Sequence, residues 1–204
     1  MSKSMTILYK VHNGLYVNLT NRCSSACTFC LRQTMETVGE SDSLWLLHEP
    51  SFDEVKKAFE EFDMKEFKEL VFCGFGEPTE RFDLLIEVAK YAKENFSIPI
   101  RINTNGQGDL INKRKIAKEM KGLIDTVSIS LNTPNADDYN KLVRSEFGEI
   151  AFDAMLEFAK EARKYVPNVV LTTVDTTISK EEEKECAKIC KNLGVTYRIR
   201  PWED

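Results

Sequence analysis

The sequence predicts an α/β fold in which about six mostly parallel strands alternate with helices. Short segments rich in β-branched and aromatic residues recur along the chain, and amphipathic segments with a helical period separate them. Parallel strands with helical connections form either a doubly wound sheet or a barrel. Because a complete eight-unit barrel usually needs about 250 residues, six units in 204 residues would make an open, partial TIM-like barrel.

The expected strands are short apolar runs that end in turn residues. "GLYVNLT" opens the series with β-branched and aromatic side chains in partial alternation. "ELVFC" is a continuous apolar run of the kind found in buried strands. We place the six strands at residues 14–20, 69–73, 98–106, 124–132, 168–176 and 195–200.

The expected helices are the amphipathic segments between these strands. Ser51 is a suitable N-cap for the first, because its hydroxyl can accept a bond from a free backbone N–H. Gly194 is a suitable C-cap for the last, because glycine readily adopts the left-handed conformation that ends many helices. We place the helices at residues 52–62, 82–96, 113–120, 135–143, 150–163 and 180–193.

Length and composition favour one globular domain over residues 1–204. A hydrophobic content of 42% is enough to bury a core. The formal net charge of −5 argues against an extended nucleic-acid-binding face, which needs clustered basic residues. No apolar run resembles a signal peptide or reaches the roughly 18 residues of a membrane span. We therefore expect a cytoplasmic protein that does not bind membranes.

Conspicuous motifs stand at the ends of the first four expected strands. A loop with three cysteines follows the first strand, "GFGEP" follows the second, "NTNG" ends the third and "SLN" ends the fourth. Ligands bind at the carboxyl ends of the strands in barrels and in doubly wound sheets. The motifs stand where either fold would place its ligand site.

The cysteine loop contains Cys23, Cys27 and Cys30 within eight residues. Three thiolates in an irregular loop can hold a [4Fe-4S] cluster and leave its fourth iron free to bind a small molecule. A structural zinc site would need four closed ligands, and disulfides are rare in the cytoplasm. The nearest further zinc candidates have no recognisable finger spacing; they are His12, His48 and Cys73.

Four motifs in order resemble those of radical S-adenosylmethionine (radical SAM) enzymes. Residues 23–30 match the CxxxCxΦC signature, and residues 74–78 resemble the GGEP motif in its GxGEP form, with Phe75 at a position that is commonly glycine. "NTNG" and "VSISLN" look like the third- and fourth-strand motifs. More narrowly, "YVNLTNRCSSACTFCLRQT" and "DTVSISLNTP" resemble the TatD family-associated radical SAM proteins, which are named for an association with TatD-type nucleases.

The resemblance implies a [4Fe-4S] cluster on the three cysteines and S-adenosyl-L-methionine on the cluster's open iron. One electron, from a reductant such as flavodoxin or ferredoxin, would cleave the sulfonium bond. The resulting 5'-deoxyadenosyl radical would abstract hydrogen from a substrate that the sequence does not identify.

The resemblance also implies contacts to S-adenosylmethionine. Phe29 would lie by the adenine, and Ser130 and Asn132 by the ribose or the carboxylate. Arg144 could pair with the methionine carboxylate. Each of these residues also has a structural interpretation. Phe29 could be a core aromatic, Ser130 and Asn132 could cap turns, and Arg144 could be a solvated surface arginine. The other residues implied at the cofactor edge are Gly74, Gly76, Glu77, Pro78 and Asn105.

The remaining cysteines and the segment after the cysteine loop have structural interpretations. Cys186 and Cys190 are four residues apart on an expected helix, which favours core packing, and we expect the same of Cys73. Residues 31–50, with Trp45, Leu46 and Leu47, would form either a lid over the site or an apolar patch that anchors the loop.

Three functional alternatives remain beside a radical SAM enzyme of unidentified substrate. A 7-carboxy-7-deazaguanine synthase usually has an Asp-Thr pair after its last cluster cysteine, where this chain has Leu31 and Arg32. A glycyl-radical activase commonly has a longer chain and acts on a protein partner. A non-catalytic iron–sulfur sensor or electron carrier would not need "GFGEP" or "NTNG".

Overall fold

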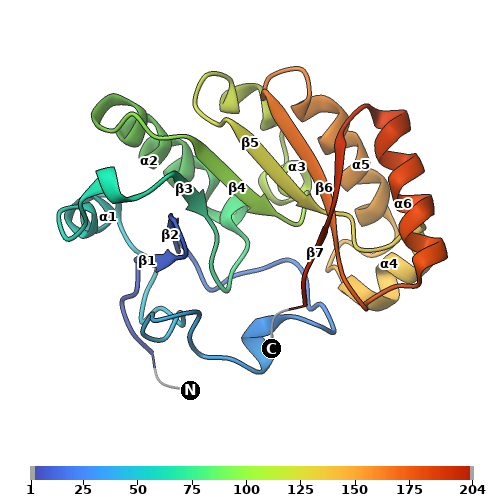
Figure 1. Cartoon of the computed structure of the whole chain (residues 1–204), viewed down its shortest axis with the longest axis horizontal. Coiled ribbons are helices and arrows are strands. Elements are labelled where there is room, and N and C mark those ends of the chain that lie inside the picture. Colours follow the sequence, from blue (N-terminus) through green and yellow to red (C-terminus); the bar gives the residue numbers. More distant parts are fainter. Residues whose placement is uncertain (1–2, 203–204) are drawn as a thin grey trace.

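The computed structural model describes residues 3–202 and shows one seven-stranded sheet (Figure 1). The strands lie side by side in chain order, from β1 to β7. β1 pairs antiparallel with β2, and every later pair of neighbours is parallel. The strands are β1 (Leu8–Val11), β2 (Gly14–Val17), β3 (Glu69–Phe72), β4 (Ile100–Thr104), β5 (Thr126–Ser130), β6 (Asn168–Val174) and β7 (Thr196–Arg200).

The strand order settles the choice between the two architectures. Because connections between parallel strands are right-handed, an order that never reverses puts every crossover on the same face of the sheet. Figure 1 shows the helices gathered on that face, with the sheet curved beneath them. The prediction of an open, partial barrel with six parallel strands is therefore confirmed.

The helices cover the convex face of the sheet. The α-helices are α1 (Phe52–Phe59), α2 (Phe82–Asn95), α3 (Gly108–Asn112), α4 (Ala136–Val143), α5 (Ile150–Ala162) and α6 (Lys180–Leu193). Short 3-10 helices are η1 (Leu31–Gln33), η2 (Met64–Glu66), η3 (Pro78–Arg81) and η4 (Ala117–Met120). Within residues 3–202, none of the helices is both long enough and apolar enough to span a membrane.

Two predicted helix caps are confirmed. The Ser51 hydroxyl accepts a hydrogen bond from the N–H of Glu54, and the Glu54 carboxylate accepts one from the N–H of Ser51. This reciprocal pair satisfies two of the donors that a helix start leaves free. At the end of α6, Gly194 adopts a left-handed conformation with φ 65°.

Two local predictions were incomplete or wrong. The sequence analysis missed β1, which forms a hairpin with β2 through His12 in a left-handed conformation at φ 51°. The helix expected at residues 113–120 is not formed as one element. Instead α3 begins earlier, at Gly108, and ends where Lys113 adopts φ 53°; η4 follows separately. Residues 113–120 have the composition of a helix, but the left-handed backbone at Lys113 prevents one continuous helix from forming there.

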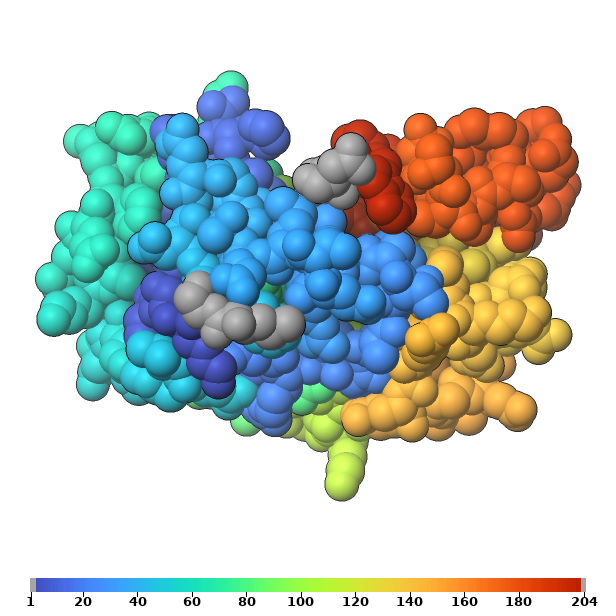
Figure 2. All heavy atoms as spheres, turned by 90° about the horizontal axis from the view of Figure 1, so that it is seen from below, coloured from blue at the N-terminus to red at the C-terminus, as the bar shows by residue number. Residues whose placement is uncertain are grey.

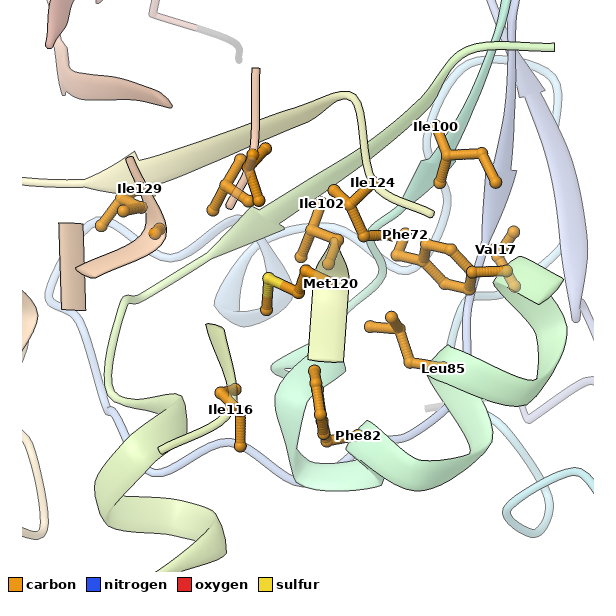
Figure 3. Packing of buried hydrophobic residues seen from close by; sticks show 14 of the residues in the cluster. Val17, Phe72, Phe82, Leu85, Ile100, Ile102, Ile116, Met120, Ile124 and Ile129 are labelled. Carbon is orange, nitrogen blue, oxygen red and sulfur yellow. The ribbon is translucent and has the colours of Figure 1, made fainter. Parts of the chain in front are cut away.

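The main core lies between the convex face of the sheet and the helices (Figure 3). Figure 3 shows Val17, Phe72 and Ile102 of the sheet together with Phe82 and Leu85 of α2. Burial of such side chains contributes roughly 1.5–3 kcal/mol each. The core also contains Cys186 and Cys190, which are 0% and 1% exposed, so their assignment to core packing is confirmed.

A second, smaller apolar cluster fixes the segment 31–50 to the sheet. Leu44 and Phe75 are buried in it, and the rings of Trp45 and Phe75 meet edge to face with centroids 5.3 Å apart. Leu46 is fully buried, whereas Leu47 is 60% exposed. Of the two interpretations of this segment, the structure supports the anchored one. Figure 2 shows the blue atoms of residues 20–45 spread across the face opposite the helices.

Candidate functional site at the carboxyl ends of the strands

The cysteine loop is held against the segment that follows α4. Ser25 forms an isolated antiparallel bridge with Ser145. The N–H of Thr28 donates to the carbonyl of Leu142 at 2.9 Å. An irregular loop at a sheet edge needs such partners for its backbone groups. The loop is thus attached to an element more than a hundred residues later in the chain.

Glu77 joins three of the strand-end motifs. Its Oε1 accepts hydrogen bonds from the hydroxyls of Thr79 and Thr104, both at 2.7 Å, and its Oε2 accepts from the N–H of Asn105 at 2.7 Å. The N–H of Glu77 donates to the carbonyl of Arg22, at the start of the cysteine loop, at 2.8 Å. Burial raises the pKa of Glu77, and the hydrogen-bond donors oppose that rise. Both carboxylate oxygens are therefore engaged within the protein, which makes Glu77 a positioning residue.

The two glycines of "GFGEP" allow the chain after β3 to approach the chain after β2. A Cβ on Gly74 would lie 2.2 Å from Oδ1 of Asn18, and a Cβ on Gly76 would lie 2.2 Å from the carbonyl oxygen of Thr20. Neither space can hold a side chain without movement of the neighbouring atoms. Pro78, buried, then begins η3.

A buried polar cluster that the sequence analysis did not identify lies beneath the loop. Oε1 of Gln107 accepts hydrogen bonds from the hydroxyls of Ser24 at 3.2 Å and Ser145 at 2.7 Å. Its Nε2 donates to the Tyr139 hydroxyl at 3.0 Å. Nδ2 of Asn105 also donates to the Ser24 hydroxyl, at 3.0 Å. The only sequence signal was that Gln107 directly follows "NTNG".

Arg32 forms a second link that the sequence analysis did not assign. Its Nη2 donates to the carbonyl of Ser25 at 3.2 Å, and its Nη1 to the carbonyl of Phe75 at 3.5 Å. The guanidinium therefore connects the cysteine loop with the motif after β3. It also brings a positive charge close to Cys23 and Cys27.

The three predicted cluster ligands are half-buried free thiols on this loop. Burial raises the pKa of Cys23 to about 12, and the charge of Glu77 adds to the rise. Burial, with the neighbouring Cys30, raises the pKa of Cys27 to about 11. Their side chains are close enough to affect one another, but in residues 3–202 no three His, Cys, Asp or Glu side chains form a group that could hold a metal ion. The three thiols therefore lie on one loop, but their side chains are not arranged as a metal-binding group.

Several residues predicted to contact S-adenosylmethionine have side chains that the rest of the protein does not fully engage. Phe29 is half-buried and packs against neither of the two apolar clusters. Asn132 follows β5 with φ 64°, and its Oδ1 is buried without a hydrogen-bond partner among the described residues. Ser130 is half-buried at the end of β5. A pocket of about 350 Å³ lies beside the loop; its lining includes Thr28 and Thr133.

Arg144 lies at the surface next to the loop. It ends α4 in a left-handed conformation with φ 49°, and its carbonyl accepts a hydrogen bond from the N–H of Ala26 at 3.3 Å. Its side chain is exposed, and no ion pair is recorded for it within the described part of the chain. The backbone of Arg144 holds the loop, while its guanidinium is left available.

The chain belongs to the Radical SAM superfamily, whose family model matches residues 17–199. That span begins in β2 and ends in β7, so the match covers the parallel part of the sheet and all four strand-end motifs.

Relatives of this chain with a described function are distant in sequence and have longer chains. A tungsten-containing aldehyde ferredoxin oxidoreductase cofactor-modifying protein from Pyrococcus furiosus is 27% identical over 185 residues, which cover 89% of this chain and 49% of the relative. A putative glycyl-radical enzyme activating enzyme from Methanocaldococcus jannaschii is 30% identical over 154 residues, which cover 73% of this chain and 60% of the relative. The chain thus spans about half the length of these relatives.

Solved structures support the fold. SuiB of Streptococcus suis, in its crystal structure bound to the precursor peptide SuiA, has a TM-score of 0.68 and 19% identity, with 94% of this chain and 39% of that chain covered. SuiB bound to S-adenosylmethionine has a TM-score of 0.66 and 18% identity, with 93% and 40% covered. At these identities the likeness shows a shared fold.

The superfamily implies a [4Fe-4S] cluster and S-adenosylmethionine, and the residues at this edge fit both by their chemistry. Three free thiols on one loop supply the cysteine ligands that such clusters take. The unpartnered Oδ1 of Asn132 is an acceptor that a ribose hydroxyl or an ammonium group would satisfy. A buried acceptor without a partner is costly, so a ligand that supplies a donor would stabilise this site.

Proposed function

We propose that this chain catalyses a radical reaction with a [4Fe-4S] cluster on Cys23, Cys27 and Cys30 and with S-adenosylmethionine. When bound, these groups would supply a 5'-deoxyadenosyl radical for hydrogen abstraction from a substrate. The observation that carries the proposal is the attachment of the cysteine loop to the other strand-end motifs, through Glu77 and Gln107. These contacts hold the three thiols beside the motifs to which the family resemblance assigns S-adenosylmethionine.

The protein residues have distinct roles in this proposal. Gly74, Gly76 and Pro78 shape the edge next to the cysteine loop. Glu77 and Asn105 hold that edge to the end of β4. This arrangement fixes the loop before any ligand binds, which lowers the cost of orienting the reacting groups.

The contacts to S-adenosylmethionine fall to side chains with free surface. Phe29 would cover the adenine, because its ring is not used in a core. Asn132 and Ser130 would bind the ribose or the carboxylate, and Arg144 the carboxylate.

We also propose that residues 1–204 form one domain, of which residues 1–2 and 203–204 lie outside the described structure. The protein would be cytoplasmic and would receive electrons from flavodoxin or ferredoxin. It would belong to the TatD-associated group and have a functional link to TatD-type nucleases.

A glycyl-radical activase is the second candidate. The 30% identity to a putative activating enzyme favours it. Such an enzyme would bind the glycine-containing segment of a protein partner. A glycyl radical detected by electron paramagnetic resonance in a protein from a neighbouring gene would distinguish an activase from an enzyme that acts on a small molecule.

The test is anaerobic reconstitution of the full chain with iron, sulfide, reductant and S-adenosylmethionine. We expect a visible cluster spectrum, a change in that spectrum when S-adenosylmethionine is added, and formation of 5'-deoxyadenosine. A cluster that neither responds to S-adenosylmethionine nor yields 5'-deoxyadenosine would support an iron–sulfur sensor or electron carrier instead.

Matched cysteine variants test the ligands in the same experiment. Cys27→Ala should lose the cluster, because two thiolates remain on the loop. Cys186→Ala also removes one thiol but from the core between α6 and the sheet, so it should keep the iron content of the wild type. A normal cluster in Cys27→Ala would contradict the ligand assignment.

A further inference from the structure

Two arginines of β7 point to the concave face of the sheet, the face opposite the main core. Tyr197 directly precedes Arg198 in "TYRIR"; it packs against the main core, and its hydroxyl pairs with the Thr173 hydroxyl at 2.7 Å. Because successive side chains of a strand point to opposite faces, Arg198 and Arg200 lie on the other face. They are in register with Thr172 and Val174 of β6.

Neither guanidinium has a partner among the described residues. Nε of Arg200 is buried and makes no hydrogen bond, and no ion pair is recorded for Arg198 or Arg200 in residues 3–202. The buried Nε of Arg200 is unfavourable without a partner, whereas the side chain of Arg198 is exposed to solvent. By contrast, Arg22, Arg81 and Arg114 each form ion pairs with carboxylates elsewhere on the protein.

The surrounding charge on the concave face is also positive. Arg101 of β4 lies on this face, but its guanidinium already binds both carboxylate oxygens of Glu69, at 2.6 and 3.0 Å. The ion pair of Glu69 among the described residues is with Arg101, although its negative charge also acts on Arg198. Partial burial, followed by the charges of Arg101 and Arg200, lowers the pKa of Arg198. Arg101, Arg198 and Arg200 thus place three guanidinium groups on this face, and the Glu69 carboxylate is already bound to Arg101.

These arginines lie near the edge that we assign to the cofactor. The charges of Arg200 and Arg101 both act on Cys73, which directly precedes Gly74 at the carboxyl end of β3. In Figure 2 the red atoms of the C-terminal strand lie at the surface beside the blue atoms of residues 20–45. Arg198 is exposed and Arg200 is half-buried, so a ligand can reach both from solvent.

We propose that Arg198 and Arg200 bind an oxyanion group, a phosphate or a carboxylate, of the substrate at the concave face beside the cysteine loop. Arginine suits this role because its planar fork donates two parallel hydrogen bonds to such a group. The proposal rests on the proposed function, since it assigns the substrate class of that same site. A neutral substrate would leave both guanidinium groups unpaired.

The test is isothermal titration of the cluster-loaded protein at low salt with inorganic phosphate and, separately, with succinate. We expect at least one of these anions to bind at a single site. Arg198→Gln and Arg200→Gln should each weaken that binding about tenfold or more, because each removes a charged hydrogen-bond donor. Preference for phosphate or for succinate distinguishes the two kinds of oxyanion.

Two further variants separate the site from general electrostatics and from misfolding. Arg114→Gln makes the same change of charge at an arginine that is paired with Asp83 and Glu119, so it should bind like the wild type. Arg200→Lys keeps the charge but not the fork, and should bind with intermediate affinity. No binding of either anion to the wild type, or equal affinity in wild type, Arg198→Gln and Arg200→Gln, would overturn the inference.

The proposed function fails by a different observation. Absence of 5'-deoxyadenosine and of a cluster response to S-adenosylmethionine would refute the radical reaction whether or not phosphate binds. Anion binding that depends on both arginines, in a protein that makes 5'-deoxyadenosine, would support both.

Discussion

The concave face of the sheet differs between its two sides. Over β1–β3 the segment 31–50 covers it with an apolar cluster, and Leu44 and Phe75 are buried there. At β7 the side chains on this face are Arg198 and Arg200, which have no partners in the described residues. One side is therefore part of the folded scaffold. The other has an exposed guanidinium, that of Arg198, and a buried donor without a partner, Nε of Arg200, both of which a ligand could bind.

Two arginines on this face show the difference most directly. Arg101 is bound by Glu69 and by Oδ1 of Asn103, at 2.7 Å from the latter. Arg198 has no comparable partner in residues 3–202. The same side chain thus serves stability in β4 and is available for binding in β7. Substitutions on the two sides of the face test whether stability and binding are divided in this way.

The largest effect on stability is expected under the covered side. Leu44 is 1% exposed, so Leu44→Ala should lower the free energy of unfolding by about 3 kcal/mol, because it removes buried methyl groups and leaves a cavity. Leu47→Ala, which makes the same change at a side chain that is 60% exposed, should change it by less than about 0.5 kcal/mol. Urea unfolding measures both. Equal effects would mean that the segment is not anchored through Leu44.

A smaller effect is expected at the paired arginine. Arg101→Gln should lower the free energy of unfolding by about 2 kcal/mol, because it leaves a partly buried Glu69 without its bidentate partner. Arg198→Gln makes the same change on an unpaired arginine and should stay within about 0.5 kcal/mol of the wild type. If the two variants lost equal stability in urea unfolding, the proposed division between scaffold and binding would be wrong.

The smallest effect on stability is expected at Asn132. Glycine tolerates its φ of 64° and removes the unpartnered Oδ1, so Asn132→Gly should change the free energy of unfolding by no more than about 1 kcal/mol. The same variant should weaken the response of the cluster spectrum to S-adenosylmethionine. A strongly destabilised Asn132→Gly would show instead that the amide has a structural role.

Local patterns predicted most of the secondary structure, and each error has its own physical cause. The hairpin of β1 and β2 was missed because β1 has only four residues, too few to show a clear strand pattern, although "HNG" is a turn sequence. The helix expected at 113–120 was misplaced because composition does not report the left-handed conformation of Lys113. Sequence reasoning could not choose between lid and anchor for residues 31–50, because the contact of Trp45 with Phe75 joins positions thirty residues apart.

In the candidate site, the sequence predicted the local motifs but not the contacts between them. The three cysteines and "GFGEP" were visible as motifs, because their spacing is local. The role of Glu77 as a connector was not visible, since its partners Thr104 and Asn105 come from the next strand. Gln107 and Arg32 were missed because each has a partner far away in the chain, Ser24 and Phe75 respectively.

The sequence by itself determined the alternation of strands and helices, the superfamily motifs and the three thiols, because each depends on residues close together in the chain. Only the tertiary structure decided that the sheet curves into an open barrel, since this depends on the order of strands in space. It alone showed that Arg198 and Arg200 remain unpaired on the concave face, because the presence or absence of a partner depends on every element that packs nearby.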